Sequence, residues 1–230
     1  MIFFSDFDGT ITQADVTDRI LEELADPAWR EVEELWVRGL IGSHECLERQ
    51  MALVNAPRKR LDALIDAIPV DPSFPAFYQF TRQQRIPFYV VSDGFDYVIR
   101  RILRRAGVDG ELRNGRHLFA SAMRVEDGRV RVAFPNSCSE HGCATCKATV
   151  LRRVDRDSQP IIFAGDGLSD RFAVEETDIV FAKHQLLDYC RRQGIACHPF
   201  ETFAEIQARL NNVVDIATMR EAHPATTLAK

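Results

Sequence analysis

Short apolar segments alternate with amphipathic segments along most of the chain, and several apolar segments end in polar residues. The apolar segments have the length of single buried strands, which predicts strands at 2–5, 87–91, 161–164 and 179–182, with a fifth candidate at 195–198. The amphipathic segments predict helices at 76–84, 97–106, 147–154 and 185–193. The pair Asp127–Gly128 between short alternating segments predicts a hairpin. Strands that alternate with helices of about ten residues are typical of a parallel α/β sheet.

The stretch 13–75 departs from this alternation. Its periodicity predicts consecutive helices, with Asp26 and Ser43 as caps, at 16–24, 27–40, 43–53 and 58–68. Because the stretch begins directly after the first strand and returns to the same edge of the sheet, we expect it to cover the strand ends as a lid. A separate helical domain is the alternative. We assign residues 1–12 and 76–230 to the core and 13–75 to a helical cap.

Two aspartates, Asp6 and Asp8, follow the first strand directly. Side chains two positions apart in an extended segment point the same way, and ligands of open α/β sheets bind just beyond the carboxyl ends of the strands. Two carboxylates this close repel each other, so that one holds a proton unless a cation lies between them. The sequence therefore predicts a metal site at the end of the first strand.

Composition narrows the class of protein. The chain has 230 residues, 46% of them hydrophobic, and a formal net charge of −5, which argues against binding to nucleic acid or to an anionic membrane. No apolar segment approaches the roughly 20 residues of a membrane span, and the opening apolar run is too short for a signal peptide. Six cysteines without a secretory context suggest reduced thiols. We expect a cytoplasmic monomer or homodimer with a small-molecule partner.

Four motifs in order, three of them at expected strand ends, resemble those of the haloacid dehalogenase superfamily of phosphatases. The motifs are Asp6-Phe7-Asp8-Gly9-Thr10, Ser92, Lys147 and Gly165-Asp166-Gly167-Leu168-Ser169-Asp170. The resemblance spans nearly the whole chain. It implies a Rossmann-like α/β core, a phosphoric monoester hydrolase activity and Mg²⁺ as cofactor, with a helical cap where this chain carries its insertion.

The resemblance also implies a role for each acidic residue of the motifs. Asp6 would be the nucleophile that forms an aspartyl-phosphate, and Asp8 the acid that protonates the leaving oxygen and then takes a proton from water. Asp6, the Asp8 carbonyl and Asp166 would bind Mg²⁺, which prefers oxygen ligands. Asp170 would support the metal or Lys147 from behind.

The phosphate group would be held by the Ser92 hydroxyl, the Gly94 amide and the positive charge of Lys147. Ser92 could instead be only a helix cap, and Lys147 only an exposed lysine. Asp93 is a departure, because relatives often carry glycine there. Since a carboxylate beside a phosphate would repel it, we expect the Asp93 side chain to point away.

The cap resembles that of the branch that holds phosphoserine phosphatase, whose cap binds the amino acid through an acid and an arginine. Asp15 takes the place of the acid, but Gln50 takes the place of the arginine, and Arg49 is turned by about 100° on the helix. The bidentate grip on a carboxylate is therefore lost. We expect Asp15, Arg49 and Gln50 to be the cap residues nearest to the substrate.

A second group of this branch fits better. The segments 134–138 and 181–187, with Cys190, resemble the enol phosphatases of methionine salvage. Their substrate, 2-hydroxy-3-keto-5-methylthiopentenyl-1-phosphate, lacks the α-amino acid and has an apolar thioether tail, which suits Gln50, Met51 and Trp36. Phosphoserine is the alternative substrate. A non-catalytic phosphometabolite-binding protein is an alternative function, which the intact set of aspartates disfavours.

Three thiols and a histidine occur within nine residues before Lys147: Cys138, His141, Cys143 and Cys146. Such a group suggests zinc. A structural zinc site usually combines two ligand pairs distant in sequence, however, and no second pair occurs. We therefore expect no stoichiometric zinc, with a redox-sensitive thiol pair and a tightly packed loop as the alternatives.

Overall fold

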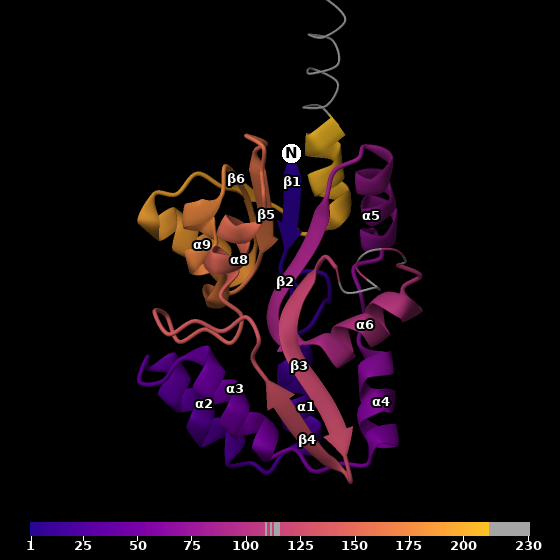
Figure 1. The fold of residues 1–230 in the computed structure, drawn as a ribbon, viewed down its shortest axis with the longest axis vertical. Coiled ribbons are helices and arrows are strands. Elements are labelled where there is room, and N and C mark those ends of the chain that lie inside the picture. Colours follow the sequence, from indigo (N-terminus) through magenta and orange to yellow (C-terminus); the bar gives the residue numbers. More distant parts are fainter. Residues whose placement is uncertain (109, 111, 113–115, 212–230) are drawn as a thin grey trace, which may run out of the picture.

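The fold is known from a computed structural model that describes residues 1–108, 110, 112 and 116–211. Its centre is a seven-stranded sheet of order β4-β3-β2-β1-β5-β6-β7 (Figure 1). The strands are β1 (Ile2–Ser5), β2 (Phe88–Phe95), β3 (Leu118–Glu126), β4 (Arg129–Ala133), β5 (Ile161–Gly165), β6 (Ile179–Ala182) and β7 (His198–Pro199). All neighbours are parallel except β3 and β4. The predicted parallel α/β fold is confirmed.

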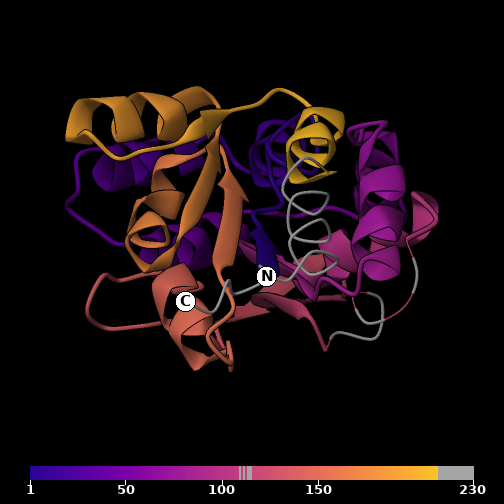
Figure 2. The same cartoon turned by 90° about the horizontal axis from the view of Figure 1, so that it is seen from above.

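Helices cover both faces of the sheet (Figure 2). In chain order they are α1 (Val16–Leu24), α2 (Trp29–Val37), α3 (Ser43–Ala52), α4 (Arg58–Ala67), α5 (Phe74–Gln83), α6 (Asp96–Arg105), α8 (Lys147–Arg153), the 3₁₀ turns η1 (Leu168–Phe172) and η2 (Val174–Glu176), and α9 (His184–Gln193). A last helical segment, 203–211, was not predicted.

The two faces have separate apolar cores. Phe3 packs on one side with Phe77 of α5 and Phe203 of the last helical segment. Phe4, its neighbour in β1, packs on the other side with residues of α8 and α9. Every residue of β1 is buried, because the strand lies at the centre of the sheet with helices on both faces. This explains why its sequence is continuously apolar rather than alternating.

The strand register brings three chain segments to one edge. Ser5 at the end of β1 lies opposite Val90 of β2 and Ala164 of β5. The residues that follow each strand therefore emerge together at the carboxyl edge of the sheet. Helices α1 to α4 lie beyond this edge (Figure 1).

The β3–β4 hairpin also reaches this group of helices. Its turn, Asp127–Gly128, has positive φ at both residues, as the predicted hairpin requires. The Gly128 carbonyl accepts a hydrogen bond from the Ala56 amide at 3.0 Å, and β4 packs against α3. The hairpin thus packs against the helices of the expected cap.

Several predicted boundaries were wrong in detail. Ser43 is not the cap of α3 but its first residue, after Gly42, because its hydroxyl is bonded elsewhere. Strand β7 is only His198–Pro199, and α2 ends at Val37. The part of the expected core beyond 211 lies outside the described residues. Among the residues that are described, no helix has the length and apolarity needed to cross a membrane.

Candidate active site

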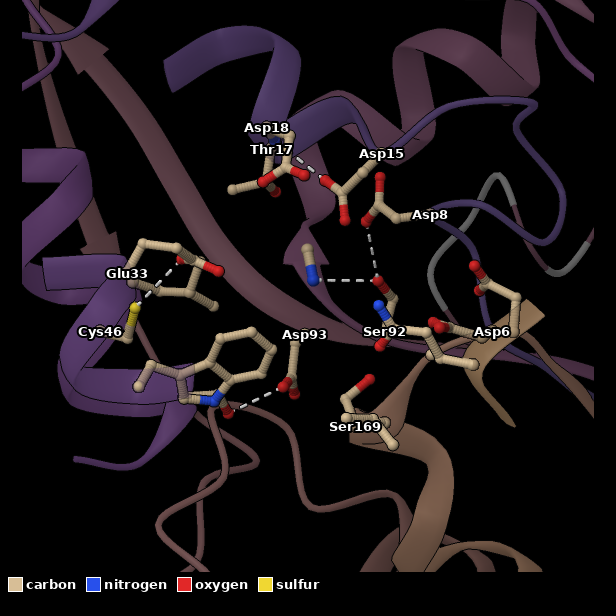
Figure 3. A pocket seen from close by; sticks show the side chains of 18 of the residues that line it. Asp6, Asp8, Asp15, Thr17, Asp18, Glu33, Cys46, Ser92, Asp93 and Ser169 are labelled. Carbon is tan, nitrogen blue, oxygen red and sulfur yellow. Dashed lines mark hydrogen bonds between the residues drawn. The ribbon is translucent and has the colours of Figure 1, made fainter. Parts of the chain in front are cut away.

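A cavity of about 410 Å³ lies between the carboxyl edge of the sheet and helices α1 to α3 (Figure 3). Its core side is lined by Asp6, Asp8, Ser92, Asp93, Gly94, Lys147, Asp166, Gly167, Leu168, Ser169, His184 and Gln185. Its cap side is lined by Asp15, Thr17, Asp18, Glu33, Trp36, Ser43, Cys46, Leu47 and Gln50. The structure thus brings all the predicted core site residues except Asp170 to the cavity wall.

Asp6 lies at the end of β1 and is only 5% exposed. Its Oδ1 accepts a hydrogen bond from the Phe7 amide at 2.7 Å, and its Oδ2 lies 2.9 Å from Lys147 Nζ. Burial, more than the charge of Asp170, raises the pKa of Asp6, while Lys147 opposes the rise. The carboxylate is held in one orientation at the floor of the cavity.

Asp8 belongs to the turn that follows. Its Oδ1 accepts a hydrogen bond from the Val16 amide at 3.1 Å, and its Oδ2 accepts one from the Ser92 hydroxyl at 3.3 Å. Burial, followed by the charge of Asp15, raises the pKa of Asp8 well above its usual range. A carboxyl group with a raised pKa can hold a proton near neutral pH, as an acid catalyst must.

Lys147, the first residue of α8, is 2% exposed and lies between two carboxylates. Its Nζ donates hydrogen bonds to Asp170 and, at 3.3 Å, to the Ser169 hydroxyl, and it forms the ion pair with Asp6. Burial works against the charge of Lys147, but Asp170 and Asp6 outweigh it and raise the pKa. Lys147 is therefore a charged residue of the site and not an exposed lysine.

Asp170 fixes the loop after β5. It is fully buried, and its Oδ2 accepts hydrogen bonds from the Asp166 and Gly167 amides at 3.0 and 3.2 Å. Its Oδ1 is engaged by Lys147. Asp170 thus has both oxygens occupied by the protein and acts behind the cavity wall.

The donor set suits a magnesium ion. Carboxylate oxygens of Asp6, Asp166 and Asp170 lie within 4.8 Å of one another. Asp6 and Asp166 line the cavity whereas Asp170 does not, so these two carboxylates are placed to bind a cation. Mg²⁺ takes one or two carboxylates together with oxygen ligands from substrate and water. Burial, followed by the charge of Asp170, raises the pKa of Asp166.

Asp166 is oriented from two sides. The Thr10 hydroxyl donates a hydrogen bond to its Oδ1 at 2.9 Å, and His184 Nδ1 lies 3.5 Å from its Oδ2. Gly9 has φ +68°, and a side chain there would overlap the Asp166 carboxylate. The glycine of the first motif is therefore needed both for its backbone conformation and for this close approach.

Ser92 lies inside β2 rather than at a helix start, because α6 begins at Asp96 after Phe95. Its hydroxyl donates to Asp8 and accepts a hydrogen bond from the Gly94 amide at 2.9 Å. Ser92 and Gly94 thus form a small polar turn beside Asp8.

Asp93 connects this turn to the cap. Its Oδ1 accepts a hydrogen bond from the Thr145 amide at 2.7 Å, and its Oδ2 accepts one from the Ser43 hydroxyl at 2.8 Å. Both oxygens are thus engaged by other segments, although the residue still lines the cavity. The sequence showed Asp93 only as a departure from the motif and did not reveal this link.

The cap side of the cavity is acidic. Asp15, Asp18 and Glu33 line it, and partial burial, then the charges of Asp15 and Glu33, raise the pKa of Asp18 to about 7. Sequence reasoning missed Asp18 and Glu33. Asp18 could have been predicted, because it follows Asp15 by almost one helical turn and so lies on the same side. Glu33 lies on another helix, and no local pattern in the sequence indicates its position.

Of the three residues predicted to be the cap contacts, two line the cavity and one does not. Asp15 and Gln50 line the cavity, and the Gln50 side chain, 1% exposed, donates a hydrogen bond to Glu33 Oε2 at 2.8 Å. Arg49 is not brought to the cavity but pairs with Glu45 at 3.3 Å on the exposed side of α3. Trp36 lines the cavity, whereas Met51 is fully buried in the core.

Comparison with known proteins identifies the family. Residues 3–175 match the sequence profile of the haloacid dehalogenase-like hydrolases. The chain belongs to this family. The protein is a hydrolase, and the four motifs read from its sequence lie around the cavity at the carboxyl edge of the sheet.

Named relatives and solved structures refine the comparison. The chain is 28% identical to 2-hydroxy-3-keto-5-methylthiopentenyl-1-phosphate phosphatase of Bacillus mycoides over 93% of this chain and 97% of that one. It is 29% identical to the protein of that name from an Exiguobacterium species, over 90% and 96% of the two chains. A substrate-bound phosphoserine phosphatase matches 90% of this chain and 97% of its own with a TM-score of 0.69 at 18% identity. The structural likeness shows the shared fold.

Proposed function

We propose that this hydrolase is a magnesium-dependent phosphomonoesterase that acts through a phosphorylated Asp6. The observation that carries the proposal is the Asp6 carboxylate at the cavity floor, 2.9 Å from the Lys147 ammonium and close to Asp166. An oriented carboxylate beside a fixed positive charge and an oxygen-only cation site meets the needs of phosphoryl transfer.

The reaction would run in two steps on this chain's own residues. Asp6 attacks phosphorus while Asp8 gives its proton to the leaving oxygen, which leaves an aspartyl-phosphate and an ionised Asp8. Asp8 then takes a proton from the water that attacks the phosphorus, and phosphate departs from a regenerated Asp6. Lys147 offsets the negative charge of the phosphoryl group throughout. Mg²⁺, held by Asp6, Asp166 and the Asp8 carbonyl, would supply further charge neutralisation.

We further propose 2-hydroxy-3-keto-5-methylthiopentenyl-1-phosphate as the substrate, on the model of the named relatives. Two features of the cavity support this choice. Among the described residues, no lysine or arginine lines its cap side, so that a substrate carboxylate would meet acidic side chains there. Trp36, Leu47 and Leu168 offer apolar surface for a thioether tail. We place the enzyme in the cytoplasm, which its six unpaired cysteines support.

Phosphoserine is the second candidate, because solved structures of similar fold are phosphoserine phosphatases and Asp15 could bind an ammonium group. Substrate competition separates the two. We expect the enol phosphate to give the highest kcat/KM in a panel with phosphoserine and p-nitrophenyl phosphate. A higher value for phosphoserine would overturn the substrate assignment and leave the chemistry intact.

The chemistry has its own test. Asp6→Asn should abolish turnover with Mg²⁺ present, because an amide is neither a nucleophile nor a good ligand for the ion. Asp188→Asn, which removes an exposed carboxylate on α9, is the matched control and should keep full activity. Rapid quenching of the wild type should trap phosphoprotein that hydroxylamine releases. Retention of more than a few per cent of turnover by Asp6→Asn would contradict the covalent route.

A further inference from the structure

A second cluster of possible metal ligands lies in the loop before α8. The thiols of Cys138, Cys143 and Cys146 and a ring nitrogen of His141 all lie within 4.8 Å of one another. Cys146 is fully buried, Cys143 is 9% exposed, and the other two side chains are partly buried. Within the described residues, the only other such group is the aspartate cluster of the active site.

The spacing is close to that of a tetrahedral zinc site. Zinc binds sulfur at about 2.3 Å and imidazole nitrogen at about 2.0–2.1 Å, which places neighbouring ligand atoms about 3.5–3.8 Å apart. The Cys138 Sγ lies 3.9 Å from His141 Nδ1, and the full set needs a contraction of at most about 1 Å to reach zinc geometry. Three sulfurs and one nitrogen form one of the common structural zinc sets.

Neighbouring side chains hold members of the cluster in place. The ring of His141 stacks on Phe172 at 3.9 Å between centroids, which fixes its plane. The Thr149 hydroxyl donates a hydrogen bond to Cys146 Sγ at 3.0 Å, which holds that sulfur in place.

We propose that Cys138, His141, Cys143 and Cys146 bind a structural zinc ion. This proposal departs from the expectation from sequence, which rested on the lack of a second ligand pair distant in the chain. His141 supplies the fourth ligand from within the same loop. Four protein ligands leave no open position, so the ion would hold the loop and take no part in the hydrolysis.

A zinc ion at this position would stabilise a loop next to the active site. The loop runs from the ligands directly into Lys147, and it touches the cap through backbone groups: the Gly142 carbonyl accepts a hydrogen bond from the His44 amide at 3.0 Å, and the Ala144 amide donates one to Ser43 at 3.0 Å. A zinc ion would fix a loop that both presents Lys147 and meets α3.

Metal content tests the proposal directly. Wild-type protein purified with reductant from zinc-supplemented cells should hold about one zinc per chain, and Cys143→Ser should hold little. Cys197→Ser, which removes a partly buried thiol outside the cluster, is the matched control and should keep its zinc. Asp166→Asn should keep it as well, because that residue belongs to the aspartate site. Zinc lost from Asp166→Asn but retained by Cys143→Ser would overturn the assignment.

Cobalt provides a readout that does not depend on variants. Metal-free wild type titrated with Co²⁺ should develop the intense thiolate-to-cobalt charge-transfer and ligand-field absorption of tetrahedral thiolate sites, and added Zn²⁺ should abolish it. Wild type that binds neither ion in this way, or that carries a disulfide between two of these cysteines under reducing conditions, would overturn the proposal in favour of a thiol pair or a purely packed loop.

Discussion

The positive charge of Lys147 offsets the repulsion between two buried carboxylates. Asp6 and Asp170 both contact its ammonium group, and Lys147 and Asp170 are almost completely buried. Removal of one partner from such a buried pair costs about 3–5 kcal/mol, because the other charge is left uncompensated. The same group therefore serves stability and orients the nucleophile, so loss of activity on its substitution would not by itself separate these roles.

Asp8 permits a sharper test at the level of one residue. Because burial and Asp15 raise its pKa, Asp8 remains protonated to higher pH than a free carboxyl group, and only the protonated form can donate to a leaving oxygen. For an alkyl phosphoester, kcat should therefore fall as pH rises through the pKa of Asp8. Asp8→Asn should lower kcat by about 10²- to 10⁴-fold and remove this fall.

The control for this prediction is the leaving group. p-Nitrophenolate departs without a proton, so Asp8→Asn should slow p-nitrophenyl phosphate far less than the alkyl ester. Profiles of kcat against pH for both substrates in both proteins provide the measurement. An identical decline at high pH in wild type and variant would assign the ionisation to another group.

At the level of elements, a contact between α2 and α3 determines what the side chain at position 50 can bind. Glu33 of α2 accepts the hydrogen bond from Gln50 of α3. An arginine introduced at position 50 would pair with Glu33, and its charge would not reach a substrate carboxylate. We therefore expect Gln50→Arg alone to improve phosphoserine hydrolysis only slightly.

The double variant Glu33→Gln/Gln50→Arg should behave differently. It frees the guanidinium group, and a charged hydrogen bond to the carboxylate is worth about 1.5–3 kcal/mol, so kcat/KM for phosphoserine should rise about 10- to 100-fold. Arg49→Gln, on the exposed side of the same helix, is the control and should leave kcat/KM unchanged. Equal gains in single and double variants would show that Glu33 does not hold residue 50.

The same elements show what sequence could reveal. Asp6, Ser92 and Asp166 lie on or directly after strands, and parallel strands bring their carboxyl ends together, so local patterns and the family motifs were enough to place them. Which face of α3 meets the cavity was partly predictable, since Gln50 and Arg49 differ by one position on a helix. The partner of Gln50 on another helix was not.

Contacts between distant segments account for most of what was missed. Ser43 has the sequence features of a helix cap, but it bonds Asp93, 50 residues away, and Ala144, 101 residues away. No feature of the sequence around Ser43 distinguishes a helix cap from a side chain that bonds distant segments. His141 was recognised as a possible ligand, yet the loop conformation that makes it the fourth member of the cluster depends on packing against Phe172.

For the whole molecule, the contact between the cap and the loop before α8 includes a close approach of the Gly42 and Gly142 backbones. A side chain at Gly42 would overlap the Gly142 carbonyl, and the backbone at Gly42 is otherwise compatible with alanine. Gly42→Ala should therefore displace the cap from the loop and cost about 1–3 kcal/mol of unfolding free energy as overpacking does. KM for a substrate that contacts the cap should rise more than KM for p-nitrophenyl phosphate.

Gly39→Ala is the control from the same connection, because a side chain there meets open space, although its φ of +69° carries a backbone cost of about 1–2 kcal/mol. Denaturant unfolding and KM for both substrates should be measured for the two variants. A rise in KM in Gly39→Ala equal to that in Gly42→Ala would attribute the effect to the connection rather than to the contact with the loop.

The β3–β4 hairpin bears on how such a cap could be exchanged between enzymes. In the sequence, the cap is one continuous insertion, 13–75, between the first two strands. In the structure, however, the Gly128 carbonyl accepts a hydrogen bond from the Ala56 amide, and β4 packs on α3. A chimera that received 13–75 alone would lose the contacts of this segment with the hairpin. It would also lose the close approach of Gly42 to the Gly142 backbone. We therefore expect a functional transfer of the cap to require three separate stretches, 13–75, 118–133 and 138–146.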